Sequence, residues 1–183
     1  HFDPFTDKAI YRRYHAADHR SGKIFNKLHL QELFNLRLDS RAPLFFWPTR
    51  LGGGRLGCWL MASLLPELLA HYALQGLQLV FVTDGDLHDH FRSLVRSLDA
   101  EDRVAVSQYD SGRQRLAFAA ADFVLMPVQY EPCGMPCKIG QRYGALPVGH
   151  ATGGVSDTVV QPDVSADHGN GFLFRTLDAE GLR

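Results

Sequence analysis

The sequence predicts an α/β fold in which helices cover both faces of a doubly wound parallel sheet. From residue 43 onward, short apolar runs alternate with stretches of helical spacing, as in proteins whose parallel strands are joined by helices. The runs at 79–82 and 123–126 are continuously apolar, which is typical of strands that lie between two layers of helices. A chain of 183 residues is also long enough to bury a substantial core within one domain.

Five strands and four connecting helices are expected. The strands are predicted at PLFFWP (43–48), LQLVFVT (77–83), RVAVSQY (103–109), FVLMPV (123–128) and ALPVGH (145–150). Helical spacing occupies the segments between them, at 57–76, 87–99, 111–122 and 135–144. Pro66 lies inside the first of these helices and predicts that it kinks or begins late, because proline lacks the amide that an interior position needs.

Residues 1–40 differ from the rest of the chain because they are rich in charge and in histidine. Within them, SGKIFNKLHLQELFNL has helical apolar spacing at Leu28, Leu33 and Leu36, so we expect a helix that packs beside the core. We therefore divide the chain into a linker segment, 1–40, and a binding domain, 41–183. The chain begins with histidine and ends in TLDAEGLR, which reads as the opening of a helix, so we expect a fragment truncated at its carboxyl end.

Composition argues against several function classes. The 19 basic and 20 acidic residues give a net charge of -1, with no block of like charge that would mark a nucleic-acid or membrane surface. The three cysteines, without a signal peptide or a long apolar span, are typical of a cytoplasmic protein rather than a secreted disulfide framework. We therefore expect no nucleic-acid partner and no membrane partner.

Two stretches have a composition that suggests a metal site, but their spacing argues against one. DGDLHDH (84–90) combines aspartates with histidines, yet Asp86 is suited to cap the following helix, where such residues are ordinary. Cys133 and Cys137 lie four positions apart, and no second cysteine or histidine pair stands at zinc spacing. We expect neither a metal nor another cofactor.

The loop after the first predicted strand is a candidate anion site. Ligands of open parallel sheets bind beyond the carboxyl ends of the strands, and TRLGGGRLG places Arg50 and Arg55 there around three glycines. A diphosphate would suit this arrangement. Neither a dinucleotide fingerprint nor a Walker lysine is present, and a flexible turn with two solvated arginines explains the stretch about equally well.

The loop after the fourth predicted strand contains a single carboxylate, Glu131, followed by a turn into the next helix. The amides of Cys133, Gly134 and Met135 are expected to point outward as unpaired donors. Such a cluster suits sugar hydroxyls and phosphate oxygens, and Glu131 would accept hydrogen bonds from the sugar. HATGG repeats the arrangement one strand later, although by itself it is only a turn.

Taken together, ADFVLMPVQYEPCGMPCKIGQRYGALPVGHATGGVSDTV resembles the carboxyl-terminal domain of bacterial glycogen and starch synthases (glycosyltransferase family 5), with its E-P-C-G-L, R-Y-G-x-L-P-V and T-G-G-L-x-D-T-V motifs. GKIFNKLHLQ, WPTRL and GNGFLF resemble further family motifs, so the resemblance covers nearly the whole chain. It implies a Rossmann-like domain, the carboxyl-terminal half of a GT-B glycosyltransferase. The implied activity is transfer of glucose, with retained configuration, from a nucleotide sugar to the nonreducing end of an α-1,4-glucan. ADP-glucose is the expected donor, with UDP-glucose as the other choice.

The resemblance also implies which residues form the site. Arg50 matches the arginine of the family's S-R-L, which neutralises the donor diphosphate. Glu131 matches the glutamate of E-P-C-G, which contacts the donor glucose, and Cys133, Gly134 and Met135 match the backbone donors beside that sugar. Arg50 and Glu131 are therefore the expected catalytic residues.

Four further positions complete the expected donor site. Tyr109 matches, by its spacing, the tyrosine that stacks near adenine, and Thr152 and Gly153 lie in the T-G-G motif. The family's phosphate-binding lysine is replaced either by Arg55, when counted from the S-R-L arginine, or by Leu56, when aligned on the following glycine. Arginine would keep the positive charge, whereas leucine would remove it.

The resemblance implies one further partner and leaves two other functions open. The partner is the protein's own amino-terminal domain, which in the family carries a K-T-G-G-L loop, so the fragment alone is expected to turn over little. A non-catalytic nucleotide-sugar or glucan-binding module with a degraded phosphate site is the main alternative. A transferase of the broader superfamily that uses another acceptor is less compatible with EPCG followed by TGG.

Overall fold

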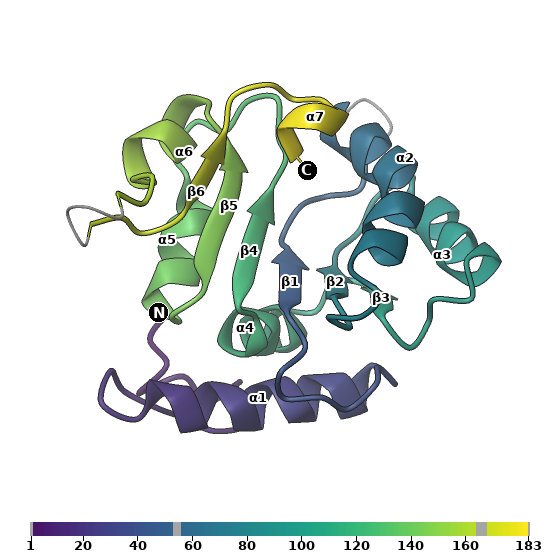
Figure 1. Ribbon diagram of the computed structural model, residues 1–183. Helices are drawn as coiled ribbons and strands as arrows, with labels where there is room; N and C mark the ends of the chain where they lie inside the picture. Colours follow the sequence, from purple (N-terminus) through teal and green to yellow (C-terminus); the bar gives the residue numbers. More distant parts are fainter. Residues whose placement is uncertain (1, 53–55, 164–167, 183) are drawn as a thin grey trace.

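The computed structural model describes residues 2–52, 56–163 and 168–182. Its centre is a six-stranded sheet in which all neighbours are parallel, in the order β3-β2-β1-β4-β5-β6 (Figure 1). The strands are β1 (Leu44–Trp47), β2 (Gln78–Val82), β3 (Val104–Ser107), β4 (Phe123–Met126), β5 (Leu146–His150) and β6 (Phe172–Phe174). The order runs outward in both directions from the β1–β4 pair, which confirms the doubly wound sheet.

Helices cover both faces of the sheet. The described helices are α1 (His19–Leu33), α2 (Leu56–His71), α3 (His88–Ser97), α4 (Ser111–Ala120), α5 (Met135–Arg142), α6 (Gly153–Thr158) and α7 (Ala179–Leu182). Side chains of α2 and α3 form one buried cluster with Leu79 and Phe81 of the sheet. Side chains of α4 and α5 form a second cluster with Phe46 and Val80, so the sheet separates two cores.

The five predicted strands are confirmed, and one strand was missed. β6 lies in GNGFLF and pairs with β5 from Val148 opposite Phe172 to His150 opposite Phe174. Three residues are too few to give a periodic pattern, and Phe172 is exposed. Pairing with β5, rather than local sequence, therefore defines this strand.

The starts of two helices differ from what the sequence suggested. Of the two possibilities given for Pro66, a kink or a late start, the late start is contradicted, because α2 begins at Leu56 and runs through Pro66 to His71. The N-cap residue of α3 is Leu87, not Asp86, and it provides no side-chain cap. A capping carboxylate does occur one connection later, where Asp110 accepts a 2.8 Å hydrogen bond from the amide of Arg113 at the start of α4.

The helix predicted in residues 1–40 is confirmed as α1, but its apolar face was assigned wrongly. Leu33 is exposed, and Leu36, although buried, lies beyond the helix end. The buried residues of α1 are mostly polar: Gly22, Lys23, Asn26, Lys27, Leu30 and Gln31. These positions are the ones that GKIFNKLHLQ shares with the family motif, so the motif is a buried packing face.

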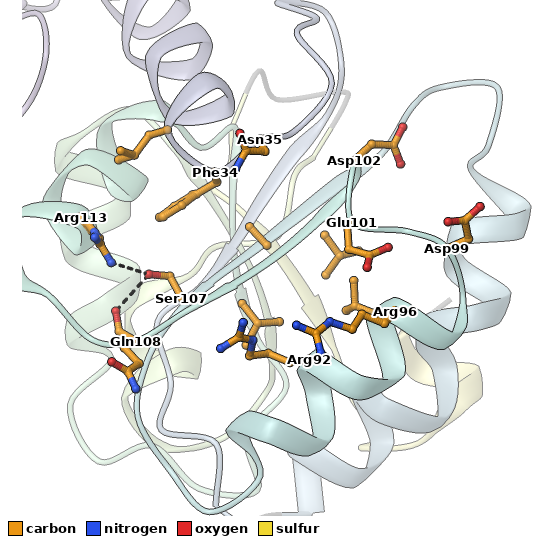
Figure 2. A pocket seen from close by; sticks show the side chains of 15 residues that line it. Phe34, Asn35, Arg92, Arg96, Asp99, Glu101, Asp102, Ser107, Gln108 and Arg113 are labelled. Carbon is orange, nitrogen blue, oxygen red and sulfur yellow. Dashed lines mark hydrogen bonds between the residues drawn. The ribbon is translucent and has the colours of Figure 1, made fainter.

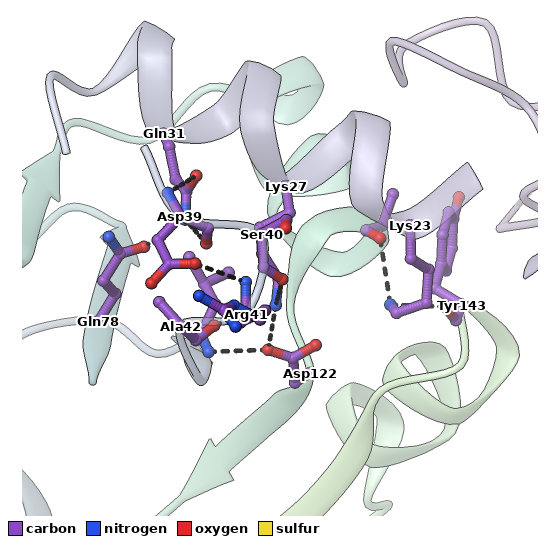
Figure 3. Close-up of polar contacts among 12 residues, drawn as sticks. Lys23, Lys27, Gln31, Asp39, Ser40, Arg41, Ala42, Gln78, Asp122 and Tyr143 are labelled. Atoms are coloured by element: carbon purple, nitrogen blue, oxygen red, sulfur yellow. Dashed lines mark hydrogen bonds and ion pairs between the residues drawn. The ribbon is translucent and has the colours of Figure 1, made fainter. Parts of the chain in front are cut away.

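Lys23 lies in a buried group of hydrogen bonds between α1 and the ends of α4 and α5 (Figure 3). Its Nζ donates to the carbonyl oxygens of Ala119 at 3.1 Å and Tyr143 at 3.0 Å. The hydroxyl of Tyr14 donates to the same Tyr143 oxygen at 2.7 Å. Burial lowers the pKa of Lys23 to about 7, with the Asp122 carboxylate acting in the opposite direction.

Lys27 joins α1 to the amino ends of β1 and β4 (Figure 3). Its Nζ donates to the Ala42 carbonyl at 3.0 Å and forms an ion pair with Asp122. One turn further along the helix, the amide of Gln31 donates to Gln78 Oε1 at 2.8 Å at the start of β2. α1 therefore closes the end of the sheet opposite the carboxyl ends of the strands (Figure 1).

Candidate functional site

The strand order places a topological switch point between β1 and β4, where ligands of open α/β sheets bind. The loops that follow these two strands carry Arg50 and Glu131. They approach closely, because a Cβ at Gly57 would lie 1.6 Å from the carbonyl oxygen of Pro127. Only glycine permits this contact between the start of α2 and the loop after β4.

A pocket of about 340 Å³ lies beside the switch point, at the carboxyl ends of β1, β2 and β3. Its lining residues are Pro48, Thr49, Arg50, Val82, Thr83, Asp84, Tyr109 and Gln114. The structure thus brings Arg50 and Tyr109 together, although 58 intervening positions separate them in the sequence. Tyr109 is 51% exposed, so its ring offers an accessible face for stacking.

The backbone of this pocket is cross-linked by hydrogen bonds between its loops. The amide of Leu51 donates to the Asp84 carbonyl at 2.9 Å, and the amide of Leu87 donates to the Leu51 carbonyl at 3.1 Å. The Thr83 hydroxyl donates to the carbonyl of Thr49. The side chains of the pocket therefore project from a fixed frame, which favours a preformed site.

Asp84 is a pocket residue that the sequence reasoning missed. Its carboxylate accepts a 3.2 Å hydrogen bond from the amide of Tyr109 and so orders the loop that presents the tyrosine ring. The stretch DGDLHDH was considered as a metal site, and Asp84 itself received no role. The usable signal was its place directly after a buried strand, where side chains of parallel sheets meet a ligand.

Arg50 is available to an anion. Arg50 is exposed, and it takes part in none of the ion pairs between described residues. A guanidinium group in this state can donate two parallel hydrogen bonds to a phosphate. Arg55 lies outside the described residues, so the choice between Arg55 and Leu56 as the replacement for the family lysine stays a prediction.

The Glu131 loop differs from the expectation of three unpaired amides. Glu131 Oε1 accepts hydrogen bonds from the amides of Cys133 at 3.4 Å and Gly134 at 3.2 Å. The expectation was wrong for these two donors because a carboxylate is itself stabilised at the N-terminus of a helix, here α5. A ligand that uses both amides must therefore displace the Glu131 carboxylate from them.

The loop after β5 packs directly on the Glu131 loop. The amide of Gly154 donates to the Glu131 carbonyl at 2.7 Å, and a Cβ at Gly153 would lie 2.3 Å from the same oxygen. Gly134 has a φ of 62°, and a Cβ there would lie 2.3 Å from the carbonyl oxygen of Gly154. The turn that contains Thr152 and Gly153 thus packs against the loop from Glu131 to Gly134.

The two thiols that follow Glu131 differ in their burial. Cys133 is exposed and Cys137 is buried, and burial raises the pKa of Cys137 to about 11, so its thiol stays protonated at neutral pH. In the described parts of the chain, no group of three or more histidine, cysteine, aspartate or glutamate side chains could hold a metal ion. No described helix is both long and apolar enough to cross a bilayer.

Comparisons with known proteins agree with this fold. No protein-family profile matches the chain. The glycogen synthase of Natranaerobius thermophilus is 36% identical over 185 residues, covering 99% of this chain and 36% of that protein. The catalytic domain of starch synthase IV from Arabidopsis thaliana, bound to ADP and acarbose, has a TM-score of 0.81 and 28% identity, covering 99% of this chain and 37% of that chain.

A more distant structure shares the fold alone. HepE from Anabaena, in complex with UDP, has a TM-score of 0.64 at 20% identity, covering 86% of this chain and 41% of that chain. The chain spans about a third of the length of the curated relatives that it matches. Over nearly its whole length the chain is related in sequence to one part of the glycogen and starch synthases, and its fold is that of a GT-B glycosyltransferase domain.

Proposed function

We propose that the chain is the donor-binding domain of a retaining glucosyltransferase that moves glucose from ADP-glucose to the nonreducing end of an α-1,4-glucan. The observation that supports the proposal is the order of three side chains along the carboxyl ends of the strands. Tyr109 follows β3, Arg50 follows β1 and Glu131 follows β4. A nucleotide sugar has the matching order of base, diphosphate and sugar, so one extended ligand would meet the three in turn.

The chemistry in this proposal is departure of a nucleoside diphosphate from the anomeric carbon. The main task of the site is to stabilise negative charge on the leaving group, and the exposed Arg50 guanidinium is suited to it. Tyr109 stacks on the base, while Thr152 and Gly153 complete the surface beside the sugar. These groups fix the donor so that the acceptor meets the anomeric carbon in a reactive position.

Glu131 has a positioning role in this reaction rather than that of a covalent nucleophile. Its carboxylate is held by the amides of Cys133 and Gly134 before a donor binds. When glucose hydroxyls displace it, the same carboxylate can accept their hydrogen bonds while the freed amides, with that of Met135, donate to the sugar. Binding and orientation of glucose would therefore be coupled through one side chain.

The choice of ADP-glucose rests on the closer structural relative. Starch synthase IV was solved with ADP at 28% identity, whereas HepE, solved with UDP, is 20% identical and supports the fold alone. The acceptor, an α-1,4-glucan, is proposed from the glycogen synthase relatives. The protein's own amino-terminal domain is the proposed partner that completes the cleft, because the chain spans about a third of those relatives.

The test uses the full-length protein with Arg50→Ala or Glu131→Ala. Each variant is expected to lose about 10²–10³-fold in glucan-dependent ADP release from ADP-glucose, since each removes a group placed for the reacting donor. Arg20→Ala, at an exposed position on α1, is the matched control and is expected to keep full activity. Unchanged turnover in either site variant would overturn its assignment.

Calorimetric titration of the unmodified protein with ADP-glucose separates the proposal from its main alternative. An enzyme is expected to bind the donor and to release ADP when glucan is added. Donor binding without any release would instead identify a non-catalytic nucleotide-sugar module. Equal turnover with UDP-glucose would sink the donor assignment while leaving the transferase assignment in place.

A further inference from the structure

β3 is an edge strand, and its outward side carries backbone groups without a strand partner. Toward β2, the carbonyls of Arg103 and Ser107 accept the amides of Leu79 and Thr83. Residues of a parallel strand alternate in the direction of their hydrogen bonds, so Val106 presents its amide and carbonyl to the open edge. No described strand lies beyond β3 in the sheet order, so this edge can accept another strand.

A groove of about 1050 Å³ runs along this edge (Figure 2). One wall is α3, from which Arg92 and Arg96 extend side by side. The opposite wall contains Leu33 and Phe34 from the end of α1, together with Arg113 from α4. The groove therefore has a cationic wall and a partly apolar wall, with the β3 edge between them.

The two arginines on α3 are free to bind an anion. Both residues are exposed, and none of the ion pairs formed within the described ranges includes either of them. Because they are four positions apart on a helix, their Cβ atoms are separated by about 5–6 Å. Side chains two positions apart on a strand are separated by about 6–7 Å, which is a close match.

The faces of β3 determine which side chains of an added strand would meet the arginines. Val104 and Val106 point toward α3, because they pack in the same cluster as Val95 of that helix. Side chains directly opposite them on an added strand would also face α3, and carboxylates there would reach Arg92 and Arg96. The side chains between them would face the opposite wall, where Leu33 is 44% exposed.

We propose that the β3 edge is a docking site for an extended segment of a partner protein in which acidic side chains alternate with apolar ones. Main-chain hydrogen bonds to Val106 supply the pairing, and the arginines on α3 select the carboxylates. The acidic residues Asp99, Glu101 and Asp102 precede β3 and repel a carboxylate at that end of the groove, which restricts the register.

A second copy of this chain does not fit the groove. The sequence of β3, VAVS, has no acidic side chain to offer the arginines. A two-fold axis that pairs two β3 strands in antiparallel fashion would also place Arg92 and Arg96 near their own copies, and like charges repel. The charge pattern of the groove therefore favours a different polypeptide.

The test measures binding of a fluorescent peptide of about eight residues, long enough to span the strand, to the full-length protein by anisotropy. A peptide that alternates aspartate with leucine is expected to bind, and one that alternates lysine with leucine is not. Arg92→Glu combined with Arg96→Glu is expected to weaken the Kd at least about tenfold. Arg13→Glu with Arg20→Glu, at exposed positions near or on α1, is the charge-matched control and is expected to leave the Kd unchanged.

Three outcomes would overturn the proposal. If the lysine peptide binds as tightly as the aspartate peptide, the groove does not select by charge. If the aspartate peptide binds the Arg92 and Arg96 double variant as tightly as the unmodified protein, the peptide binds elsewhere. The same aspartate peptide with alternate amides methylated loses its donors to the edge, so undiminished binding of that peptide would exclude strand addition. A dimer in sedimentation that the double variant strengthens would assign the edge to a second copy.

Discussion

Basic side chains lie at both ends of the sheet, but they are buried at one end and exposed at the other. At the amino ends of the strands, Lys23 and Lys27 are buried, and each ammonium group donates to backbone carbonyls. At the carboxyl ends, Arg50 is exposed and takes part in none of the ion pairs found in the described chain. The hydrogen bonds of the two buried lysines join elements of the fold, whereas an exposed cation in a pocket is available to a ligand.

The carboxylates follow the same division. Asp122 accepts from Lys27 and from the amide of Leu44, so it joins α1 to the start of β1. Among the described residues, the Glu131 carboxylate accepts from two amides of its own loop, at 3.4 and 3.2 Å, which are long hydrogen bonds that a ligand can replace. The difference predicts that substitutions at the α1 end change stability, while those at the loop end change ligand binding.

The largest effect is expected for Lys27→Met. This substitution leaves the Asp122 carboxylate without its cation and should lower the free energy of unfolding by about 2–4 kcal/mol, less than a fully buried pair because Asp122 is partly exposed. Urea denaturation followed by circular dichroism measures the change. Arg50→Ala is the comparison at the other end of the sheet and should alter the same free energy by less than about 0.5 kcal/mol. Equal losses would contradict the division between the two ends.

A smaller effect is expected at the contact between the two ligand loops. Gly134→Ala places a Cβ 2.3 Å from the Gly154 carbonyl oxygen at a positive φ, and should cost about 2–3 kcal/mol of unfolding free energy while weakening donor binding. Gly76→Ala is the matched control, because Gly76 has nearly the same φ, 64°, with nothing within 4 Å of the added Cβ. It should cost only about 1 kcal/mol, which is the cost of the left-handed backbone conformation alone. Identical costs would show that the loop contact is not tight.

The sequence predicted the parts of the fold that depend on local pattern. The continuous apolar runs at 79–82 and 123–126 identified β2 and β4, because strands covered on both faces have no polar side. β6 escaped because three residues carry no periodicity, so only its partner β5 defines it. The face of α1 was misjudged because buried Lys23 and Lys27 look exposed in a pattern that scores lysine as polar.

The candidate site was predictable where the position of a residue directly after a strand determines where it lies in the fold. Placement after a strand brought Arg50 and Tyr109 to one pocket, as parallel sheets require. The engagement of the Cys133 and Gly134 amides by Glu131 was not predictable, because it depends on a side-chain conformation that sequence does not specify. The hydrogen bond from Tyr109 to Asp84 likewise joins two loops 25 positions apart.

The smallest effect expected is a pH dependence that Lys23 alone confers. Its pKa is about 7 in the folded protein, because of burial, against an ordinary value of 10.5. Between these two values the unfolded chain binds more protons at Lys23 than the folded chain does, so the free energy of unfolding rises with pH, by up to about 1 kcal/mol between pH 7 and pH 8. Lys23→Met removes the titrating group and should remove this rise, measured as the difference between the two proteins in urea denaturation at each pH. A parallel pH dependence in both proteins would mean that the Lys23 ammonium stays charged in the folded state, held by the Ala119 and Tyr143 carbonyls.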